Sequence, residues 1–513
     1  MRIFSLLLAA AFAIPCLAAT SISSIPGTRG VRIVGQAAGD ALGYSNMAAL
    51  GDINGDGRTD IALAAPGVDR VGATDVGAVY VHFGADGNLS NLDVSTLNGT
   101  NGFKVVGSAL AQNSQLGIFT TGIGDINNDD ASDLLIGSRG VLQGTAQIGR
   151  AYIIFGKPTG QAFPASIDVS NLGSAGVVLN GASGNDFFGS NAVSGGGDLN
   201  GDGIEDFAIG AEGFNALGGI VYLIFGRVSW PTSLSVSSEA ASSVVQFTQE
   251  SAGDQLGSFV SIGTDINNDT RSDLFINAYA GDAVANNAEG KLYVVFGRPS
   301  GTPFPASQSV GTLNGSDGFQ IRGNVNFAGF GSPVIALGDF NGDGLGDFAA
   351  SGVVGAGSAA LIYGKSNWDA INSLAELSGP NGTRFAGAAA GDAAGAYLAA
   401  PGDVNGDGKS DLLISAPGAD ISGFANVGKV YLIYGTDVPF AADVNLSAVE
   451  STIVGEVFQG STAGFAAGPI SGIGKFSNVD TLPDFVIASE TVNGDVYVVT
   501  KVNGTLFRNG FEN

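Results

Sequence analysis

Short apolar runs alternate with polar, glycine-rich stretches along almost the whole chain. A typical pair is Ile61–Ala65 and Val79–Phe83, with Gly, Asn and Asp residues at the boundaries. Runs of about four to eight residues with such boundaries are typical of β-strands, and no stretch shows a convincing helical period. The pattern predicts an all-β fold built from short strands.

These strands recur as a unit. One strand follows the pattern Gly-x-x-Tyr-x-x-Phe-Gly, as in Gly77–Gly84, and the next resembles Gly-Phe-x-Val-x-Gly, as in Gly102–Gly107. Further copies of the first pattern contain Tyr152–Gly156, Tyr222–Gly226, Tyr293–Gly297 and Tyr431–Gly435. The period is about 70 residues, and four short strands per period are typical of one blade of a β-propeller.

A polar loop with a fixed pattern precedes one strand of each unit. Its first copy, Asp52–Asp60, reads D-x-N-x-D-G-x-x-D. Oxygen-bearing side chains stand at positions 1, 3, 5 and 9, the glycine at position 6 permits a sharp turn, and position 7 offers its backbone carbonyl. This arrangement is the first part of an EF-hand-type loop, in which hard oxygen ligands converge on Ca²⁺. The loop therefore predicts a calcium site.

Six copies of this loop keep the oxygen-bearing positions, and we predict one Ca²⁺ in each. The predicted ligands at positions 1, 3, 5, 7 and 9 are Asp52, Asn54, Asp56, Arg58 and Asp60; Asp125, Asn127, Asp129, Ala131 and Asp133; Asp198, Asn200, Asp202, Ile204 and Asp206; Asp265, Asn267, Asp269, Arg271 and Asp273; Asp339, Asn341, Asp343, Leu345 and Asp347; and Asp403, Asn405, Asp407, Lys409 and Asp411. In a seventh copy, Lys475, Ser477 and Val479 replace Asp, Asn and Asp, and Asp484 is one residue out of register. We predict no calcium there.

The repeated unit resembles the FG-GAP repeat. The resemblance rests on Phe-Gly before the loop (Phe188-Gly189), the loop itself, and Ala-Pro-Gly after it (Ala65-Pro66-Gly67), although copies one, two and four have Leu-Gly instead. FG-GAP repeats form the blades of the integrin α-chain head and of many bacterial secreted proteins. The resemblance covers nearly the whole chain after residue 30. It implies a seven-bladed β-propeller of four-stranded antiparallel blades.

The two ends of the repeat region complement each other. Gly30–Gly35 matches the last strand of a unit, but no earlier strands of that unit precede it. The seventh copy supplies Phe485–Ala488 and Gly494–Val499 but no fourth strand. We expect the N-terminal strand to complete the last blade, which would remove the open sheet edges. The predicted organisation is a short lead over residues 19–29, one propeller over 30–501 and a C-terminal tail over 502–513.

Residues 1–18 are typical of an export signal. Arg2 is followed by the apolar run Phe4–Ile14 and by a small-x-small cleavage site, Cys16-Leu17-Ala18. The apolar run is too short to span a membrane, which needs about 20 residues. Acylation of Cys16 is the alternative, but Pro15 fits that pattern poorly. We expect a secreted, extracellular or cell-surface-associated protein that has no cysteine once residues 1–18 are removed.

Composition narrows the range of partners and reactions. The formal net charge is −26, which disfavours binding to nucleic acid or to an anionic membrane. His82 is the only histidine and lies in a predicted strand where other copies have Ile or Val, so His-based catalysis and a His-based zinc site are disfavoured. No catalytic residue is predicted, although paired carboxylates for glycoside chemistry remain open.

The predicted function is therefore that of an interaction module. We expect calcium to have a mainly structural role, and adhesion to an extracellular protein or glycan by a monomer. One alternative is a calcium-dependent carbohydrate-active enzyme, a lyase or hydrolase, with a groove formed by long insertions such as Val68–Gly77. A structural role in an envelope or matrix layer is a second alternative. Fold by itself does not separate these functions.

Overall fold

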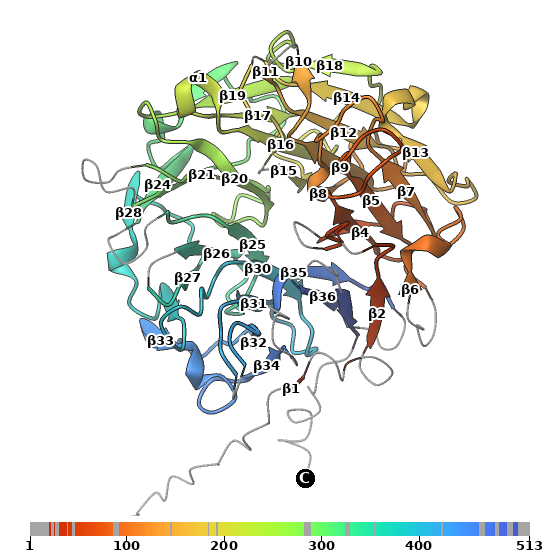
Figure 1. Ribbon diagram of the computed structural model, residues 1–513. Helices are drawn as coiled ribbons and strands as arrows, with labels where there is room; N and C mark the ends of the chain where they lie inside the picture. The colour runs from red at the N-terminus through yellow and green to blue at the C-terminus, as the bar shows by residue number, and fades with distance from the viewer. Residues whose placement is uncertain are drawn as a thin grey trace, which may run out of the picture.

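The computed structural model describes residues 20–21, 25, 30–37, 39–43, 47–85, 92–143, 146–182, 184–190, 193–281, 289–323, 329–352, 355–421, 424–460, 467–477, 482–489 and 496–500. Seven five-stranded sheets are arranged in a ring, as Figure 1 shows from one face. The predicted fold class, a seven-bladed all-β propeller, is confirmed.

The first four blades share one strand order, in which four consecutive strands pair antiparallel. Blade 1 holds β3 (Met47–Gly51), β4 (Asp60–Ala65), β5 (Ala78–His82) and β7 (Gly102–Val106). Blade 2 holds β8 (Leu116–Gly124), β9 (Asp133–Ser138), β12 (Arg150–Ile154) and β14 (Gly176–Asn180). Blade 3 holds β15 (Val193–Gly197), β16 (Asp206–Ala211), β17 (Ile220–Ile224) and β19 (Val244–Thr248). Blade 4 holds β20 (Leu256–Gly263), β21 (Asp273–Ala278), β22 (Lys291–Val295) and β24 (Gly318–Arg322).

The last three blades follow the same order, but blade 7 takes its fourth strand from the start of the chain. Blade 5 holds β25 (Val334–Gly338), β26 (Asp347–Gly352), β27 (Ser358–Ile362) and β29 (Gly382–Ala386). Blade 6 holds β30 (Leu398–Gly402), β31 (Asp411–Ala416), β32 (Lys429–Ile433) and β34 (Gly455–Gln459). Blade 7 holds β35 (Ala467–Gly474), β36 (Asp484–Ser489), β37 (Val496–Val499) and β2 (Gly30–Val34).

Each blade also carries a short fifth strand that the sequence pattern does not predict. It pairs parallel with the fourth strand, and it comes from the segment that leads into the fourth strand of the next blade. For blades 1 to 5 these strands are β13 (Ser166–Asp168), β18 (Ser233–Ser235), β23 (Ser307–Ser309), β28 (Ile371–Ser373) and β33 (Asp443–Asn445); blade 6 receives β1 (Thr20–Ser21) and blade 7 receives β6 (Leu92–Asp93). The fifth strands therefore tie neighbouring blades together.

Both ends of the repeat region meet in blade 7. Strand β2 pairs antiparallel with β37, with Gly30 opposite Val499 and Ile33 opposite Val496. The innermost strands contact one another in order around the ring, and β35 contacts β3. The lead segment is also part of the ring, since β1 extends blade 6.

The core lies between the blades. The second and third strands are buried along nearly their whole length, and β4 and β5 at every residue, because each blade is covered on both faces by its neighbours. This is why these strands appear in the sequence as continuous apolar runs without polar alternation. The repeated tyrosines Tyr80, Tyr222 and Tyr293 are at most 1% exposed. Outside the sheets, the described residues contain a small hairpin of β10 (Leu142–Gln143) and β11 (Ala146–Gln147), several 3-10 turns, and the four-residue helix α1 (Phe214–Leu217).

His82 is one of the buried strand residues. Its side chain is 2% exposed, and burial lowers its pKa to about 4, so it is neutral at pH 7. Nε2 has no hydrogen-bond partner. The described part of the chain contains no helix that is long and apolar enough to cross a membrane.

Candidate functional site

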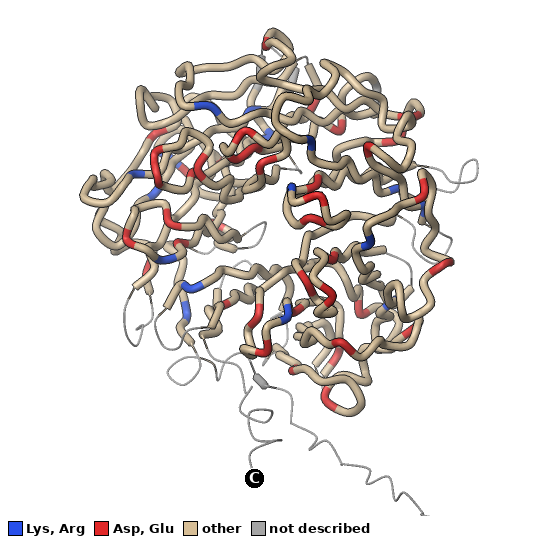
Figure 2. The backbone as a smooth tube through the Cα atoms, turned by 180° about the vertical axis from the view of Figure 1, so that it is seen from behind, with Lys and Arg blue, Asp and Glu red and all other residues tan. Residues whose placement is uncertain are grey.

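The six predicted calcium loops all connect the first strand of a blade to its second strand, so they lie on one rim of the ring. In loop 1, the carboxylate of Asp52 accepts the backbone N–H groups of Asp56 (2.9 Å) and Gly57 (2.7 Å). The same pair of bonds to the position-1 carboxylate recurs in the other five loops. Figure 2, seen from behind, shows that acidic residues recur around the whole ring.

Position 6 requires a left-handed backbone. Gly57 has φ 88°, a conformation that glycine adopts without steric cost. In loops 2 and 4 the residue at this position is not glycine, yet Asp130 and Thr270 keep φ near this range, at 69° and 71°. The turn is thus a property of the loop as a whole, and the carboxylate at position 1 holds it in place.

Positions 3, 5 and 7 form a second set of contacts. In loop 1, the Asn54 amide donates to the Asp56 carboxylate at 3.2 Å, and the Arg58 N–H donates to the same carboxylate at 3.0 Å. Equivalent bonds occur in loops 2 to 6. In loop 2, Oδ1 of Asn127 is buried and has no hydrogen-bond partner. A buried acceptor without a donor is the kind of atom that a cation would satisfy.

The aspartate at position 9 is the first residue of the second strand and is fully buried in every loop. Asp60 accepts the N–H of Ile53 at 2.9 Å and that of Gly84, after the third strand, at 2.8 Å. The equivalent aspartates are Asp133, Asp206, Asp273, Asp347 and Asp411, each with the same two kinds of donor. Position 9 therefore anchors the loop to the third strand, a role that the sequence pattern does not reveal.

Burial makes these position-9 carboxylates difficult to ionise. Desolvation is the largest cause of the raised pKa, the position-5 carboxylate adds to it, and the position-1 carboxylate adds to it in five of the six loops. The pKa is raised to about 8 for Asp60, Asp133, Asp206 and Asp411 and to about 7 for Asp347, and it is raised well above the ordinary value for Asp273. In loops 1 and 4 a cationic side chain forms an ion pair with the position-5 carboxylate, Arg58 with Asp56 at 3.8 Å and Arg271 with Asp269 at 3.7 Å.

The carboxylates of one loop do not converge on a single point. Among the described residues, no group of three His, Cys, Asp or Glu side chains is arranged to hold a metal ion. The hydrogen bonds give the physical reason, because the aspartates at positions 1, 5 and 9 each accept backbone N–H groups. The atoms predicted to bind the ion are all oxygens, which are the ligands that Ca²⁺ prefers. Calcium at these loops remains a prediction.

The seventh loop keeps the buried aspartate at the start of the second strand but lacks the aspartates at positions 1 and 5. Its first residue is Lys475, whose carbonyl accepts the Thr59 N–H of blade 1 at 3.3 Å. One additional residue lengthens the loop, which explains the shift of Asp484 in the sequence pattern. Asp484 nevertheless begins β36, is 1% exposed, and accepts the Ser477 N–H at 2.8 Å. Val479 lies outside the described residues.

Adjacent loops are linked around the rim. The N–H at position 8 donates to the position-1 carbonyl of the preceding loop, as from Ser132 to Asp52 at 2.9 Å and from Ser410 to Asp339 at 2.8 Å. Between blades 2 and 3 the Glu205 carboxylate accepts the Asp125 N–H at 2.7 Å. This backbone contact between neighbouring loops leaves no signal in the residue at position 8, which varies from loop to loop. Only the fact that every blade has its loop at the same place could have suggested it.

A second candidate site lies on the opposite rim. A pocket of about 470 Å³ is formed by residues at the ends of strands remote from the loops, and four blades contribute to it. Its lining is Ile118, Phe119, Ser190, Glu212, Gln255, Ser258, Phe259, Tyr279 and Ser332. The Phe119 and Phe259 rings meet edge to face at 5.8 Å although they belong to blades 2 and 4, and Tyr279 is 40% exposed. Tyr279 directly follows Ala278, the last residue of β21.

Comparisons with known proteins agree with this architecture. The FG-GAP repeat model matches residues 48–82, 190–224 and 395–433, in blades 1, 3 and 6. Integrin alpha-PS5 of Drosophila melanogaster is 31% identical over 184 residues, which is 36% of this chain and 16% of that protein. Integrin alpha-V of Gallus gallus is 33% identical over 171 residues, 33% of this chain and 14% of that protein.

The matched region is therefore a small part of each relative. Integrin alpha-PS2 of Drosophila melanogaster, with 28% identity over 258 residues, is likewise covered over 16% of its length. The seven-bladed ring, the three FG-GAP matches and the similarity to integrin α chains together support an FG-GAP β-propeller that resembles the integrin α type.

Proposed function

We propose that this protein is a secreted, calcium-stabilised propeller that acts as an adhesion or interaction module. The observation that carries the proposal is the repeated loop: six oxygen-rich loops lie on one rim, each with a buried position-9 carboxylate whose pKa is raised by burial. Similarity to integrin α chains supports an interaction role.

Calcium would supply the missing positive charge. In each loop, the side chains at positions 1, 3, 5 and 9 and the carbonyl at position 7 would hold the ion, and Ca²⁺ at such a site provides charge balance and rigidity. In loop 2, the buried Asn127 Oδ1 without a donor fits this assignment. Because the loops are linked from blade to blade, ion binding in one loop would also stiffen its neighbour.

The contact with a partner would be made on the other rim. The pocket beside Phe119, Phe259 and Tyr279 combines aromatic faces with the carboxylate of Glu212. Aromatic faces suit sugar rings and apolar side chains, and a carboxylate suits a hydroxyl or a basic group. We therefore infer an extracellular protein or glycan as the partner and a monomeric propeller as the binding form.

A binding screen tests the proposal. Residues 19–513 are applied to arrays of glycans and matrix proteins, once with calcium and once with chelator, and the retained glycans are assayed for new chain ends. We expect calcium-dependent retention that Tyr279→Ala lowers at least tenfold and that Phe424→Ala, at another exposed aromatic, leaves unchanged. Retention without an effect of Tyr279→Ala would refute the assignment of this rim, and new glycan ends would favour the carbohydrate-active alternative.

A further inference from the structure

A covering segment recurs between successive blades. After the third strand of blades 2 to 6, the chain crosses the loop-side rim of the preceding blade and delivers an aromatic residue three positions before the short fifth strand. These residues are Phe163 before β13, Trp230 before β18, Phe304 before β23, Trp368 before β28 and Phe440 before β33. From the end of the third strand, the aromatic follows after six to nine residues.

The aromatic side chain closes the gap over the preceding blade. Phe163 stacks on Phe103 of β7, with ring centroids 4.3 Å apart, and Trp368 stacks on Phe319 of β24 at 4.0 Å. Phe440 meets Phe385 of β29 edge to face at 5.7 Å. Such contacts bury apolar surface and hold the covering segment in place.

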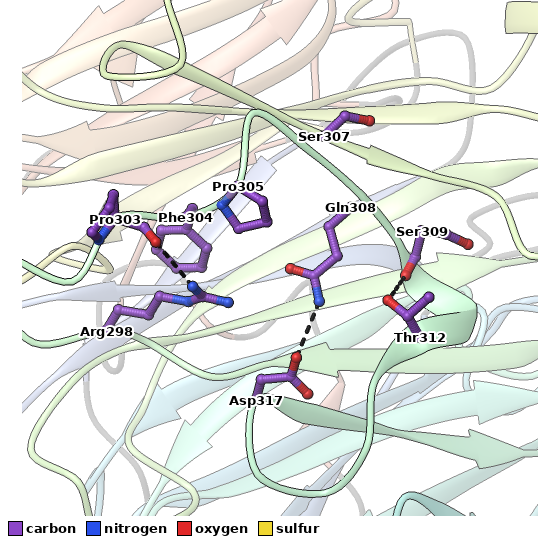
Figure 3. A pocket seen from close by; sticks show the side chains of 9 residues that line it. All are labelled: Arg298, Pro303, Phe304, Pro305, Ser307, Gln308, Ser309, Thr312 and Asp317. Atoms are coloured by element: carbon purple, nitrogen blue, oxygen red, sulfur yellow. Dashed lines mark hydrogen bonds between the residues drawn. The ribbon is translucent and has the colours of Figure 1, made fainter.

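In blades 2 to 5 a cation lies over the same aromatic ring. Figure 3 shows this segment in blade 4, where Arg298 lies against Phe304 and donates to the Pro303 carbonyl at 3.0 Å. The corresponding pairs are Lys157 with Phe163, Arg227 with Trp230 and Lys365 with Trp368, at 5.1, 4.3 and 4.4 Å from the ring centroid. Thr436 takes the place of the cation in blade 6.

The covering segment also touches the loop of the preceding blade. The Thr159 hydroxyl donates to the Gly55 carbonyl of loop 1. Three residues before the fourth strand, Gly315 and Gly379 lie so close to the segment that a Cβ would fall 2.7 and 2.5 Å from the carbonyl oxygens of Trp368 and Phe440. The loop-side rim of a blade is thus covered by the covering segment of the next repeat.

On blade 6 this surface carries a pocket of about 930 Å³. Its lining includes Gly406 of loop 6, Tyr434 after the third strand, and Thr452, Ile453 and Val454 before the fourth strand. These are the positions that the covering segment meets on other blades. Ile453 and Val454 stand where blade 1 has Thr100 and Asn101, so the surface is more apolar here, and Val454 is 37% exposed.

The connectivity of the chain explains why blade 6 differs. Its fifth strand is β1, and the residue three positions before β1 is Leu17. The expected cleavage after Ala18 removes Leu17. The third strand of blade 7 ends at Val499, and the chain continues with residues 501–513, which lie outside the described residues. Leu506 and Phe507 follow Val499 by seven and eight residues, within the range found in blades 2 to 6.

We propose that Leu506 and Phe507 of the C-terminal tail fill the pocket on blade 6. The tail supplies the apolar side chains that the next repeat supplies elsewhere, while β1 supplies the fifth strand from the other end of the chain. Thr452 stands where blades 1, 4 and 5 have a glycine in close contact with the covering segment, so on blade 6 contact is made by the tail's side chains rather than by close backbone approach. Because Gly406 lines the pocket, the tail also rests on loop 6.

Engineered cysteines test this docking, since Cys16 is the only cysteine of the sequence and residues 19–513 contain none. Val454→Cys is combined with Arg508→Cys, which leaves Leu506 and Phe507 intact. The matched control combines Arg508→Cys with Val228→Cys, an exposed valine in the covering segment that leads to Trp230. Disulfide formation under mild oxidation is followed by mass spectrometry at low protein concentration, and the same spectrum verifies that the chain begins at residue 19.

We expect the Val454 pair to form an intramolecular disulfide at least about tenfold faster than the control pair, because docking raises the effective concentration of the two thiols. Adding Phe507→Asp should reduce that rate to the control level. Equal rates in the two pairs would overturn the proposal, as would disulfides only between chains. An exported protein that retains Leu17 would also overturn it, because the pocket would then have its occupant from the N-terminal side.

Discussion

At the scale of single residues, the position-9 aspartates have a role that does not depend on calcium. Asp206 accepts N–H groups from Leu199 and Gly226 and is fully buried, whereas Asp202 of the same loop is exposed. Asp206→Asn should lower the free energy of unfolding in chelator by about 1–3 kcal/mol, because the amide nitrogen leaves one buried N–H without an acceptor. Urea unfolding measures this loss.

The matched control is Asp202→Asn, which should change stability in chelator by less than about 0.5 kcal/mol, as is usual for exposed positions. In calcium, both variants should lose one bound ion. If both variants were equally stable in chelator, position 9 would serve the metal alone and the anchoring role would be wrong.

The raised pKa values of the position-9 carboxylates predict a pH dependence of the metal-free protein. Their pKa is about 8 in the folded state for Asp60, Asp133, Asp206 and Asp411, and 3.8 is the ordinary value. Between these pH values the folded state holds protons that the unfolded state has released. The contribution of these carboxyl groups to the free energy of unfolding is therefore fully present below about pH 4 and is lost as the pH rises toward 8. In chelator, we expect Tm to fall from pH 6.5 to pH 8.

Calcium should remove or reverse this trend, since the ion favours the charged carboxylates and its affinity rises as they lose protons. The side chain of His82 acts with the opposite sign below pH 6.5, because its folded pKa is lowered to about 4. The variant His82→Ile, with the residue found at this position in other blades, separates the two effects. A Tm in chelator that rises between pH 6.5 and pH 8 would contradict the assigned burial of the carboxylates.

At the scale of the blade, the sequence predicts the strands that are buried on both faces and the loops whose spacing is repeated. The strands β4 and β5 were visible as apolar runs because both of their faces are covered, and the loop Asp52–Asp60 was visible because its spacing is constant. The fifth strands were not predicted, since a three-residue strand such as β13 has no periodicity to detect. The aromatic cover was missed for a related reason: Phe163 and Trp230 follow the third strand at different distances, and only the fifth strand brings them into register.

The loop pattern predicts the calcium stoichiometry blade by blade. Asp202→Ala removes one carboxylate of loop 3 and should lower the number of bound ions by one, whereas Lys475→Ala in the seventh loop should leave it unchanged. Isothermal titration calorimetry of residues 19–513 counts the ions, with six expected for the unaltered protein. An ion lost on removal of Lys475 would show that the seventh loop does bind metal.

At the scale of the whole molecule, the ring depends on a blade built from both ends of the chain. Ile33 of β2 is fully buried and lies opposite Val496 of β37, whereas Ile136 of β9 is equally buried inside a blade made from consecutive strands. If the ring unfolds as one cooperative unit, Ile33→Ala and Ile136→Ala should each lower the free energy of unfolding by about 2–5 kcal/mol, the usual cost of removing a buried isoleucine side chain. Urea unfolding in saturating calcium measures both, with Val71→Ala at a fully exposed site as the control.

The comparison of the two variants tests how strongly the chain ends are joined. A single transition with similar losses means that blade 7 is as firmly held as blade 2, and that the pairing of β2 with β37 carries the closure of the ring. A separate early transition for Ile33→Ala, with the rest of the ring still folded, would mean that blade 7 opens by itself. Fluorescence of Trp230 and Trp368, in the covering segments over blades 2 and 4, reports on the remote blades and distinguishes these outcomes, because neither tryptophan lies in blade 7.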